Sequence, residues 1–340
     1  MRRHGGRMQQ RTQPKPPSRP RVVDIIAEGL SVTIARPWLL LIPIVVDLIF
    51  WIGVKIEPAA LMHSLVTLVN DSDVEDSSDV ISSLNDLASS NMSQLGTLFI
   101  PSMLSGVPRS EIYEITDQTI WRPGSSGLVL LVALGLILVG SLVSMAYSVP
   151  IADAILGRKR NAGELVRAIW RAWYRMVALL GLIVGGVIAL AIPVGIVAAI
   201  FAVGGVDLLP LFSSLLLLGG IAALFYGYFV FDAIVIADVG PITAIRYSVG
   251  VVHRNIRAAI GFILASLLLT TGIPEIAESL LSEAPGLIIA VGVQAVIATG
   301  AAAASFLFFV DRLRSWRPEL IQLPQTAPAF ELTRQGESRS

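Results

Sequence analysis

One aspartate, Asp47, stands inside an apolar stretch, IPIVVDLIF, where its charge demands an explanation. A charged carboxylate near the middle of a bilayer is costly unless it is protonated or paired, so such a residue is a functional candidate. The functional interpretation is a relay for protons or cations. We favour the structural interpretation, a protonated or hydrogen-bonded carboxyl group packed against serines such as Ser141 or Ser144, because no Lys or Arg stands inside the apolar stretches.

Three other aspartates end apolar stretches, and three arginines recur at matching places: Asp153, Asp232 and Asp311, with Arg175, Arg254 and Arg36. A carboxylate at the carboxyl end of a helix is electrostatically unfavourable, and a nearby arginine would compensate. The pattern therefore predicts structural ion pairs, with Arg175 turned inward toward Asp153 or the aspartate of a neighbouring unit. The alternative is a ring of acids that binds a substrate.

Three arginines recur every four residues in ELVRAIWRAWYR, residues 164–175, and form one stripe of an amphipathic helix: Arg167, Arg171 and Arg175. Each arginine near an anionic lipid surface contributes about 1 kcal/mol of attraction, and Trp170 and Trp173 suit the headgroup layer. The pattern predicts a helix that lies flat in the interface, roughly perpendicular to the membrane spans. The first two arginines and both tryptophans are then expected to face lipid.

An acidic run begins like a calcium-binding loop, with Asp71, Asp73 and Glu75 at alternate positions. Asp76 occupies the position that needs glycine, however, and Ser82 replaces the closing glutamate, so a solvated acidic surface is the better interpretation. The chain has no cysteine, and its three histidines lie far apart in sequence. Thiolate sites are thereby excluded and a histidine metal site is disfavoured. The sequence predicts no metal and no cofactor.

Signatures of common enzyme classes are missing as well. The chain contains no G-x-x-x-x-G-K-[ST] phosphate loop, no H-E-x-x-H zinc motif and no G-x-S-x-G nucleophile elbow. Its formal net charge is zero, so no bulk field points to nucleic acid. We therefore expect a protein that is not an enzyme, has no catalytic residue and does not bind nucleic acid.

The elements that would carry these residues are apolar helices. The chain of 340 residues is 54% apolar and only 15% charged, and its charges crowd between long apolar stretches, which is typical of a membrane protein. Each stretch must be helical, because lipid offers no partner for free backbone groups. The sequence predicts an all-α, polytopic bundle of six transmembrane helices at Trp38–Ile56, Gly127–Ile151, Met176–Val203, Leu208–Ala237, Ile256–Ile273 and Gly286–Val310.

The basic residues predict the orientation of this bundle. With six spans, 22 of the 25 Lys and Arg residues fall on one side of the membrane, and Lys55, Arg109 and Arg122 fall on the other. Because the side richer in Lys and Arg is cytoplasmic, both termini are expected in the cytoplasm. The abundance of arginine and alanine indicates a bacterial gene, and hence a multi-pass protein of the plasma or inner membrane.

Three segments lie outside the predicted spans. Residues 1–21, which are basic and rich in proline, and residues 319–340 are expected to be disordered cytoplasmic tails. The membrane domain between them, residues 22–318, contains one long external loop, residues 57–126. A loop of this length usually has a function or a fold of its own, and we expect short helices that lie on the outer surface or cap the bundle.

Several residues of the membrane domain recur 79 positions further along the chain. Three segments that precede a span resemble one another: IIAEGLSVTIAR (25–36), ELVRAIWRAWYR (164–175) and TAIRYSVGVVHR (243–254). At this offset Tyr147, Asp153, Arg167 and Arg175 match Tyr226, Asp232, Arg246 and Arg254, and Asp311 follows Asp232. We predict three units, each an interfacial helix followed by a pair of spans that ends in aspartate. The alternative is that any apolar helix followed by a basic loop resembles another.

Small residues on two helices allow close packing, at Gly181-x-x-x-Gly185 and in the run Gly300–Ser305. We expect these faces to pack inside the bundle rather than to form a dimer interface.

One stretch carries a family resemblance. ADVGPITAIRYSVGVVHRNIRAAIGFIL, residues 237–264, resembles a pattern in the membrane domain fused to some bacterial glycerophosphodiester phosphodiesterases and in related stand-alone six-helix membrane proteins. The shared features are a Gly-Pro turn, an Ala-Ile-x-x-Ser amphipathic helix, a basic residue with Asn, and a membrane helix. The resemblance is specific for Asp232–Gly261, with a weak echo at 22–45 and 153–180. It implies a membrane anchor or partner domain and carries over no catalytic residue, because the hydrolase of the fused proteins is a separate soluble domain.

These observations predict a non-enzymatic accessory, scaffold or lipid-interacting membrane protein. Its expected partners are membrane lipid and a membrane or cytoplasmic protein. The alternative function is a small transporter or permease that uses Asp47 and the interface between repeats.

Overall fold

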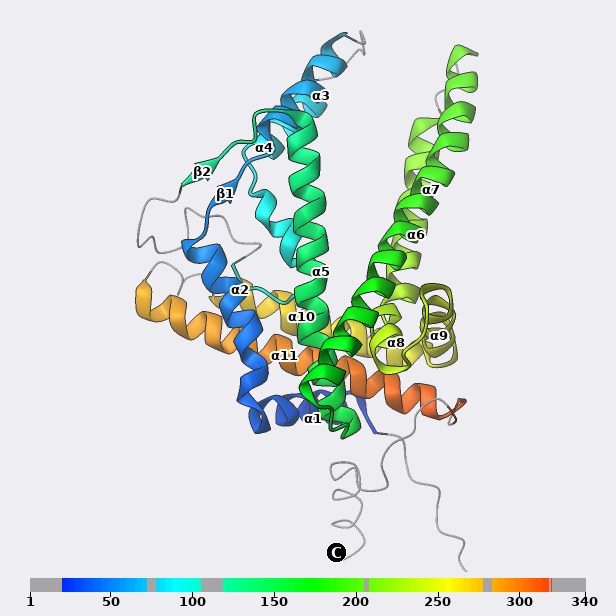
Figure 1. Ribbon diagram of the computed structural model, residues 1–340. Coiled ribbons are helices and arrows are strands. Elements are labelled where there is room, and N and C mark those ends of the chain that lie inside the picture. Colours follow the sequence, from blue (N-terminus) through cyan, green and yellow to red (C-terminus); the bar gives the residue numbers. More distant parts are fainter. Residues whose placement is uncertain are drawn as a thin grey trace, which may run out of the picture.

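The computed structural model describes residues 20–71, 78–104, 119–204, 208–277, 283–317 and 319. This part of the chain is helical apart from one pair of short strands, so the predicted all-α class is confirmed (Figure 1). The predicted tails fall almost wholly outside the described residues, as do Asp73, Glu75 and Asp76. The elements are α1 (Val22–Ala35), η1 (Pro37–Leu40), α2 (Leu41–Ile52), β1 (Lys55–Ile56), α3 (Ala59–Asp71), α4 (Ser78–Ala88), η2 (Met92–Thr97), β2 (Ile120–Trp121), α5 (Ser126–Leu156), α6 (Ala162–Val203), α7 (Leu209–Gly227), α8 (Val230–Ile236), α9 (Pro241–Arg254), α10 (Ile256–Ala277) and α11 (Ala284–Arg314).

Several helices are long and apolar enough to cross a membrane. Within the described residues there are four such segments: Ser126–Leu156, Ala162–Ala198, Pro210–Ile236 and Pro285–Arg314. Two further apolar segments are sharply bent, and the number rises to six if each bent pair is counted as one span.

The helices differ in how much of their surface the protein itself covers. In α6, only 6% of the most apolar stretch is buried within the protein. In α11 the corresponding share is 56%. Figure 1 shows α5 diverging from α6 and α7, which rise together away from α8 and α9, while α10 and α11 cross the lower half of the view. Side chains such as Ile188 on α6 and Leu224 on α7 are therefore exposed, as expected where lipid rather than protein is the neighbour.

Two helices turn through about a right angle before the next helix begins. The angle is 96° between α1 and the η1–α2 segment, and 105° between α9 and α10. At the first bend, Pro37 disfavours a helical conformation for Arg36, which ends α1 with φ −136°. At the second bend, Asn255 leaves the helical conformation with φ −132°. Its side-chain amide donates to the Val251 carbonyl oxygen at 3.0 Å. The helices expected before these two spans are thus present and nearly perpendicular to them.

The third predicted bend is absent. Helix α6 runs unbroken for 42 residues from Ala162 to Val203, so the prediction of a separate, perpendicular helix over residues 164–175 is wrong. The junction reads Arg175-Met176-Val177-Ala178 and has no residue that breaks a helix.

Close helix packing centres on α1 and α11. Gly29 of α1 faces Gly300 and Ala304 of α11, and a Cβ atom built on Gly29 would lie 2.3 Å from the Gly300 carbonyl oxygen. The run at residues 300–305 therefore packs inside the protein, as expected. The predicted packing of Gly181 and Gly185 is not formed in the described part of the chain, because no heavy atom lies within 4 Å of a Cβ built on either glycine.

The long loop contains short helices, as predicted, and also a small parallel sheet that was not predicted. Strands β1 and β2 pair Lys55 with Ile120 and Ile56 with Trp121. The first predicted span, Trp38–Ile56, is consequently too long, because α2 ends at Ile52 and the chain is extended from Lys55.

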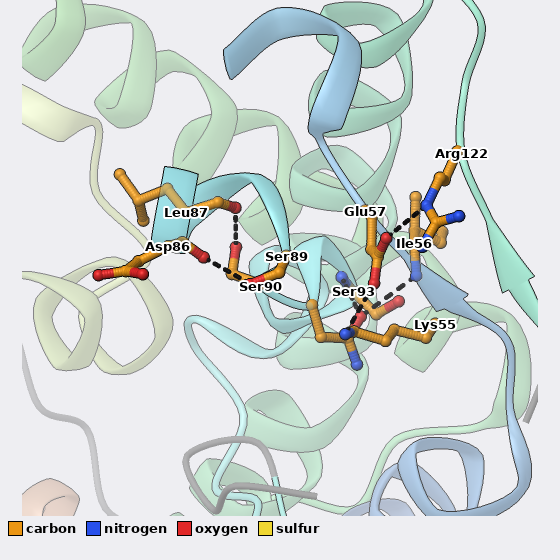
Figure 2. A network of polar contacts seen from close by, with 10 residues as sticks. Lys55, Ile56, Glu57, Asp86, Leu87, Ser89, Ser90, Ser93 and Arg122 are labelled. Carbon is orange, nitrogen blue, oxygen red and sulfur yellow. Dashed lines mark hydrogen bonds and ion pairs between the residues drawn. The ribbon is translucent and has the colours of Figure 1, made fainter. Parts of the chain in front are cut away.

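A polar network fastens this sheet (Figure 2). The carboxylate of Glu57, which follows β1, lies 2.8 Å from Lys55 Nζ and 2.7 Å from Arg122 Nε. The backbone N–H of Ile56 donates to the Asn91 side chain at 3.4 Å, which ties β1 to the segment after α4. The opposite ends of the loop are thereby held together.

Candidate functional site

The carboxylate of Asp47 is a buried anchor for the long loop. Asp47 is 1% exposed on α2. Its Oδ1 accepts a hydrogen bond from the Ser102 hydroxyl at 2.5 Å and another from the Leu104 N–H at 3.1 Å. Its Oδ2 accepts from the Met103 N–H at 3.2 Å. Both carboxylate oxygens are therefore engaged by one short stretch of the loop.

The structural interpretation of Asp47 is the one that these contacts favour, although its partners differ from those expected. The predicted partners lie elsewhere: Ser141 donates to the Leu138 carbonyl oxygen at 2.8 Å, and Ser144 donates to the Phe99 carbonyl oxygen at 2.8 Å. The residue missed by sequence reasoning is Ser102. Its only sequence signal was its place in an apolar part of the loop, next to residues able to enter the protein core.

The three helix-ending aspartates have other partners than the predicted arginines. Asp153 Oδ1 lies 3.4 Å from Arg160 Nη2 in the turn after α5. The buried Asp232 of α8 accepts a hydrogen bond from the Ser305 hydroxyl of α11 at 2.5 Å. Asp311 Oδ2 lies 3.4 Å from Nη1 of the adjacent Arg312. The described residues contain no group of three or more acids and histidines that could hold a metal ion, so these three aspartates do not form a metal site.

The three predicted arginine partners also lie elsewhere. Arg254 stacks over Trp316, with its guanidinium carbon 4.7 Å from the ring centroid. Arg175 forms an ion pair with Asp238, in the turn between α8 and α9. Arg36 stands at the first bend and has no ion pair with any described residue.

A basic cavity lies where α5 ends, α6 begins and the α8–α9 turn passes. Its volume is about 210 Å³. Three arginines and two acids line it together with apolar side chains of α5, α6 and α8: Arg160, Arg167 and Arg171, Glu164 and Asp238, and Val149, Ala168, Ala172, Ile234 and Val235. The cavity thus has an apolar floor and a charged rim.

The charges of this rim are unevenly compensated. Arg171 Nη1 lies 2.8 Å from Asp238 Oδ2, and Arg175 is paired with the other oxygen of the same carboxylate. Arg160 has the longer contact with Asp153. Among the residues that the structure describes, Arg167 has no ion pair, although it lines the cavity between Glu164 and Arg171. Arginines four apart on a helix repel one another, so this row favours an anion.

The two tryptophans of α6 behave differently from each other. Trp170 is 60% exposed, in keeping with a place in the headgroup layer. Trp173 lies against α5 instead, where its indole N–H donates to the Leu138 carbonyl oxygen and the Ser141 hydroxyl, each at 3.1 Å. The expectation that Trp173 faces lipid is wrong for this reason.

Asp238 is the second residue with buried or charged contacts that sequence reasoning missed. It has φ 52°, and it is the one residue other than glycine described with a positive φ. Its side chain is 52% exposed and pairs with two arginines of α6. Asp tolerates this conformation better than most residues. The Gly-Pro motif after Asp238 predicts a turn at this place, but it does not predict the ion pairs with the two arginines of α6.

Comparison of the chain with protein-family models, with curated proteins and with solved structures finds no match. The function is therefore inferred from the contacts and charges of the chain itself.

Proposed function

We propose that the chain is a non-enzymatic, lipid-interacting membrane protein with six spans, whose basic face binds the anionic surface of the cytoplasmic leaflet. The proposal includes a bacterial inner membrane and both termini in the cytoplasm, in agreement with the distribution of Lys and Arg. Six spans follow if each bent pair crosses the membrane once with its second arm.

The observation that carries the proposal is the pair of right-angle bends. They set α1 at 96° to the η1–α2 segment and α9 at 105° to α10, so each of the two helices lies across the apolar segment that follows it. Helix α9 buries Ala244, Ser248 and Val251 on one face, and it exposes Ile242 and Arg246 on the other. A face that combines apolar and basic side chains suits the headgroup layer, where both find a partner.

A threefold repeat is part of the same proposal. It is supported by the two bends and by the position of three aspartates. Asp153 and Asp311 lie in the last turns of α5 and α11, and Asp232 lies in the first turn of the short α8, among the last five residues of the apolar segment Pro210–Ile236. The unbroken α6 is the departure from the pattern, and it lies in the unit whose basic segment lines the cavity. The resemblance to the membrane domain of glycerophosphodiester phosphodiesterases remains a prediction, and it agrees with this accessory role.

The alternative function, a transporter that uses Asp47, has less support. A relay carboxylate must exchange its partners during a cycle, whereas that of Asp47 is occupied by three hydrogen bonds from one loop. The basic cavity at the start of α6 is not lined by Asp47.

The test compares the protein in nanodiscs of phosphatidylglycerol and of phosphatidylcholine. We expect a higher midpoint of thermal unfolding in the anionic lipid at low salt, because each arginine near the surface is attracted by about 1 kcal/mol. The difference should shrink at about 1 M salt, where the screening length falls to roughly 3 Å. Equal midpoints in the two lipids at low salt would overturn lipid binding and favour a protein partner for the same face.

A further inference from the structure

We propose that the basic cavity at the start of α6 binds a single phosphate group, carried by an anionic lipid headgroup or free in solution, and that Asp238 is the internal counter-ion which this phosphate displaces. The inference rests on the proposed function and gives its site and ligand class. The cavity is the place on the basic face where a general attraction to anionic lipid becomes specific binding.

The size of the cavity selects a small group. Its volume of about 210 Å³ is below the roughly 300–1,000 Å³ of pockets that enclose a drug-sized ligand. A phosphate group fits such a space, while the rest of a lipid has to remain outside. The buried side chains of Val149, Ile234 and Val235 form the apolar part of its lining.

The charge of the rim selects an anion. Arg160, Arg167 and Arg171 all line the cavity, and Arg167 is the one without an ion pair in the described part of the chain. Arginine binds phosphate through two parallel N–H donors, which gives both strength and orientation. The guanidinium N–H groups of Arg167 can thus donate to a phosphate. A phosphate bound to them would lie in the cavity that Arg171 also lines.

Asp238 is the counter-ion of two arginines beside the cavity. Its carboxylate neutralises Arg171, whose side chain is 49% exposed, and Arg175, whose side chain is 22% exposed, while its own side chain is 52% exposed. Arg175 is not among the residues that line the cavity, so the carboxylate can release Arg171 and keep the less exposed Arg175. A phosphate carries more charge and more acceptor oxygens than a carboxylate. An incoming phosphate can therefore displace Asp238 from Arg171.

The location of the cavity favours a lipid as the source of the phosphate. The site lies at the ends of apolar helices α5 and α8, and the exposed Trp170 stands on the same part of α6 as its arginines. In the proposed topology this is the level of the cytoplasmic headgroups, where basic pockets between helices bind lipid phosphates.

The experiment measures binding to the purified full-length protein in neutral detergent. The probes are dihexanoyl phosphatidylglycerol, dihexanoyl phosphatidylcholine and inorganic phosphate, and dissociation constants come from the rise of the unfolding midpoint with ligand concentration. The variants are Arg167→Gln and Asp238→Asn. The matched control is Arg122→Gln, which removes an exposed arginine that lies outside the cavity and, in the proposed topology, on the opposite side of the membrane.

We expect Arg167→Gln to weaken phosphatidylglycerol binding at least roughly tenfold and Arg122→Gln to leave it unchanged. Asp238→Asn should tighten it several-fold, because the competing charge is removed. Equal affinities for Arg167→Gln, Arg122→Gln and the unaltered protein would overturn the site, and so would weaker binding in Asp238→Asn. Inorganic phosphate that competes fully with phosphatidylglycerol would support the phosphate site and assign it to the free ion.

The failure of this inference is distinguishable from that of the proposed function. If the unfolding midpoints in nanodiscs depend on lipid charge but Arg167→Gln binds phosphatidylglycerol as tightly as the unaltered protein, the phosphate site is wrong. The proposed binding of the basic face to anionic lipid is then unaffected. If the midpoints do not respond at all, the proposed function fails first.

Discussion

At the scale of single residues, Asp47 is expected to stabilise the protein rather than to carry ions. Asp47→Ala removes the acceptor for three hydrogen bonds and leaves the backbone N–H groups of Met103 and Leu104 buried without a partner. Each such group costs about 1–3 kcal/mol, so we expect a loss of several kcal/mol in the free energy of unfolding. The measurement is thermal unfolding in detergent. Asp86→Asn, on the exposed surface of α4, is the control, and equal behaviour of the two variants would contradict the anchor.

A second residue, Glu57, predicts a dependence on pH. Burial by itself raises the pKa of Glu57, but the hydrogen bonds and charges of Lys55 and Arg122 outweigh it and hold the pKa below the usual 4.5. A group whose pKa is lowered in the folded state contributes stability above its unfolded pKa and loses that contribution as the pH falls. We therefore expect Glu57→Gln to lower stability by roughly 1–2 kcal/mol at pH 7.

The unfolding midpoints of this variant and of the unaltered protein should converge as the pH is lowered through about 4.5 and below. A difference that stays constant down to pH 3 would show that the carboxylate of Glu57 does not hold the strand pair through its charge.

Sequence reasoning located these charged residues but not their partners. Asp47 and Ser102 are 55 residues apart, and no periodicity in the chain connects them. Asp238 and Arg171 are 67 residues apart and meet because α8 turns back toward the start of α6. Contacts of this kind depend on how the helices are arranged in space, which the composition of each helix leaves open.

At the scale of helices, the approach of α1 to α11 depends on Gly29. In Gly29→Ala the new methyl group meets the Gly300 carbonyl oxygen and the Ala304 backbone, so the two helices must separate. We expect a loss of about 1–3 kcal/mol, as for other overpacked sites, seen as a lower unfolding midpoint.

Gly181→Ala is the matched control, because it introduces the same methyl group on a helix where the space is open. This change should be neutral or stabilising by up to about 1 kcal/mol, since alanine favours helix more than glycine. Destabilisation by Gly181→Ala would contradict the open face of α6.

Helix boundaries were predictable where a residue dictates them. Pro37 and Asn255 mark the two bends, and hydropathy identified the apolar helices. The shape of residues 164–175 was not predictable from their amphipathic pattern, because that pattern is equally compatible with a separate flat helix and with the first turns of a longer one. The absence of a helix breaker near Met176 was the better signal.

At the scale of the whole molecule, we expect the orientation in the membrane to follow from charge. A reporter active only in the cytoplasm should work when it is fused after Ser340 and fail when it is inserted at Ser89, after α4. The physical reason is that segments rich in Lys and Arg are retained on the cytoplasmic side. Activity at Ser89 with none at Ser340 would reverse the assignment of the two faces.

The continuity of α6 has a mechanical consequence. A helix of 42 residues is about 63 Å long, more than the roughly 40–45 Å of a whole bilayer with its headgroups. Up to Pro193, where one backbone hydrogen bond is lost, it acts as a stiff lever. In the bent pairs α1–α2 and α9–α10, by contrast, the angle between the two helices can change. A movement near one leaflet is then not transmitted along the pair. A tilt imposed on Arg167 and Arg171 would thus be carried by α6 to the opposite side of the membrane.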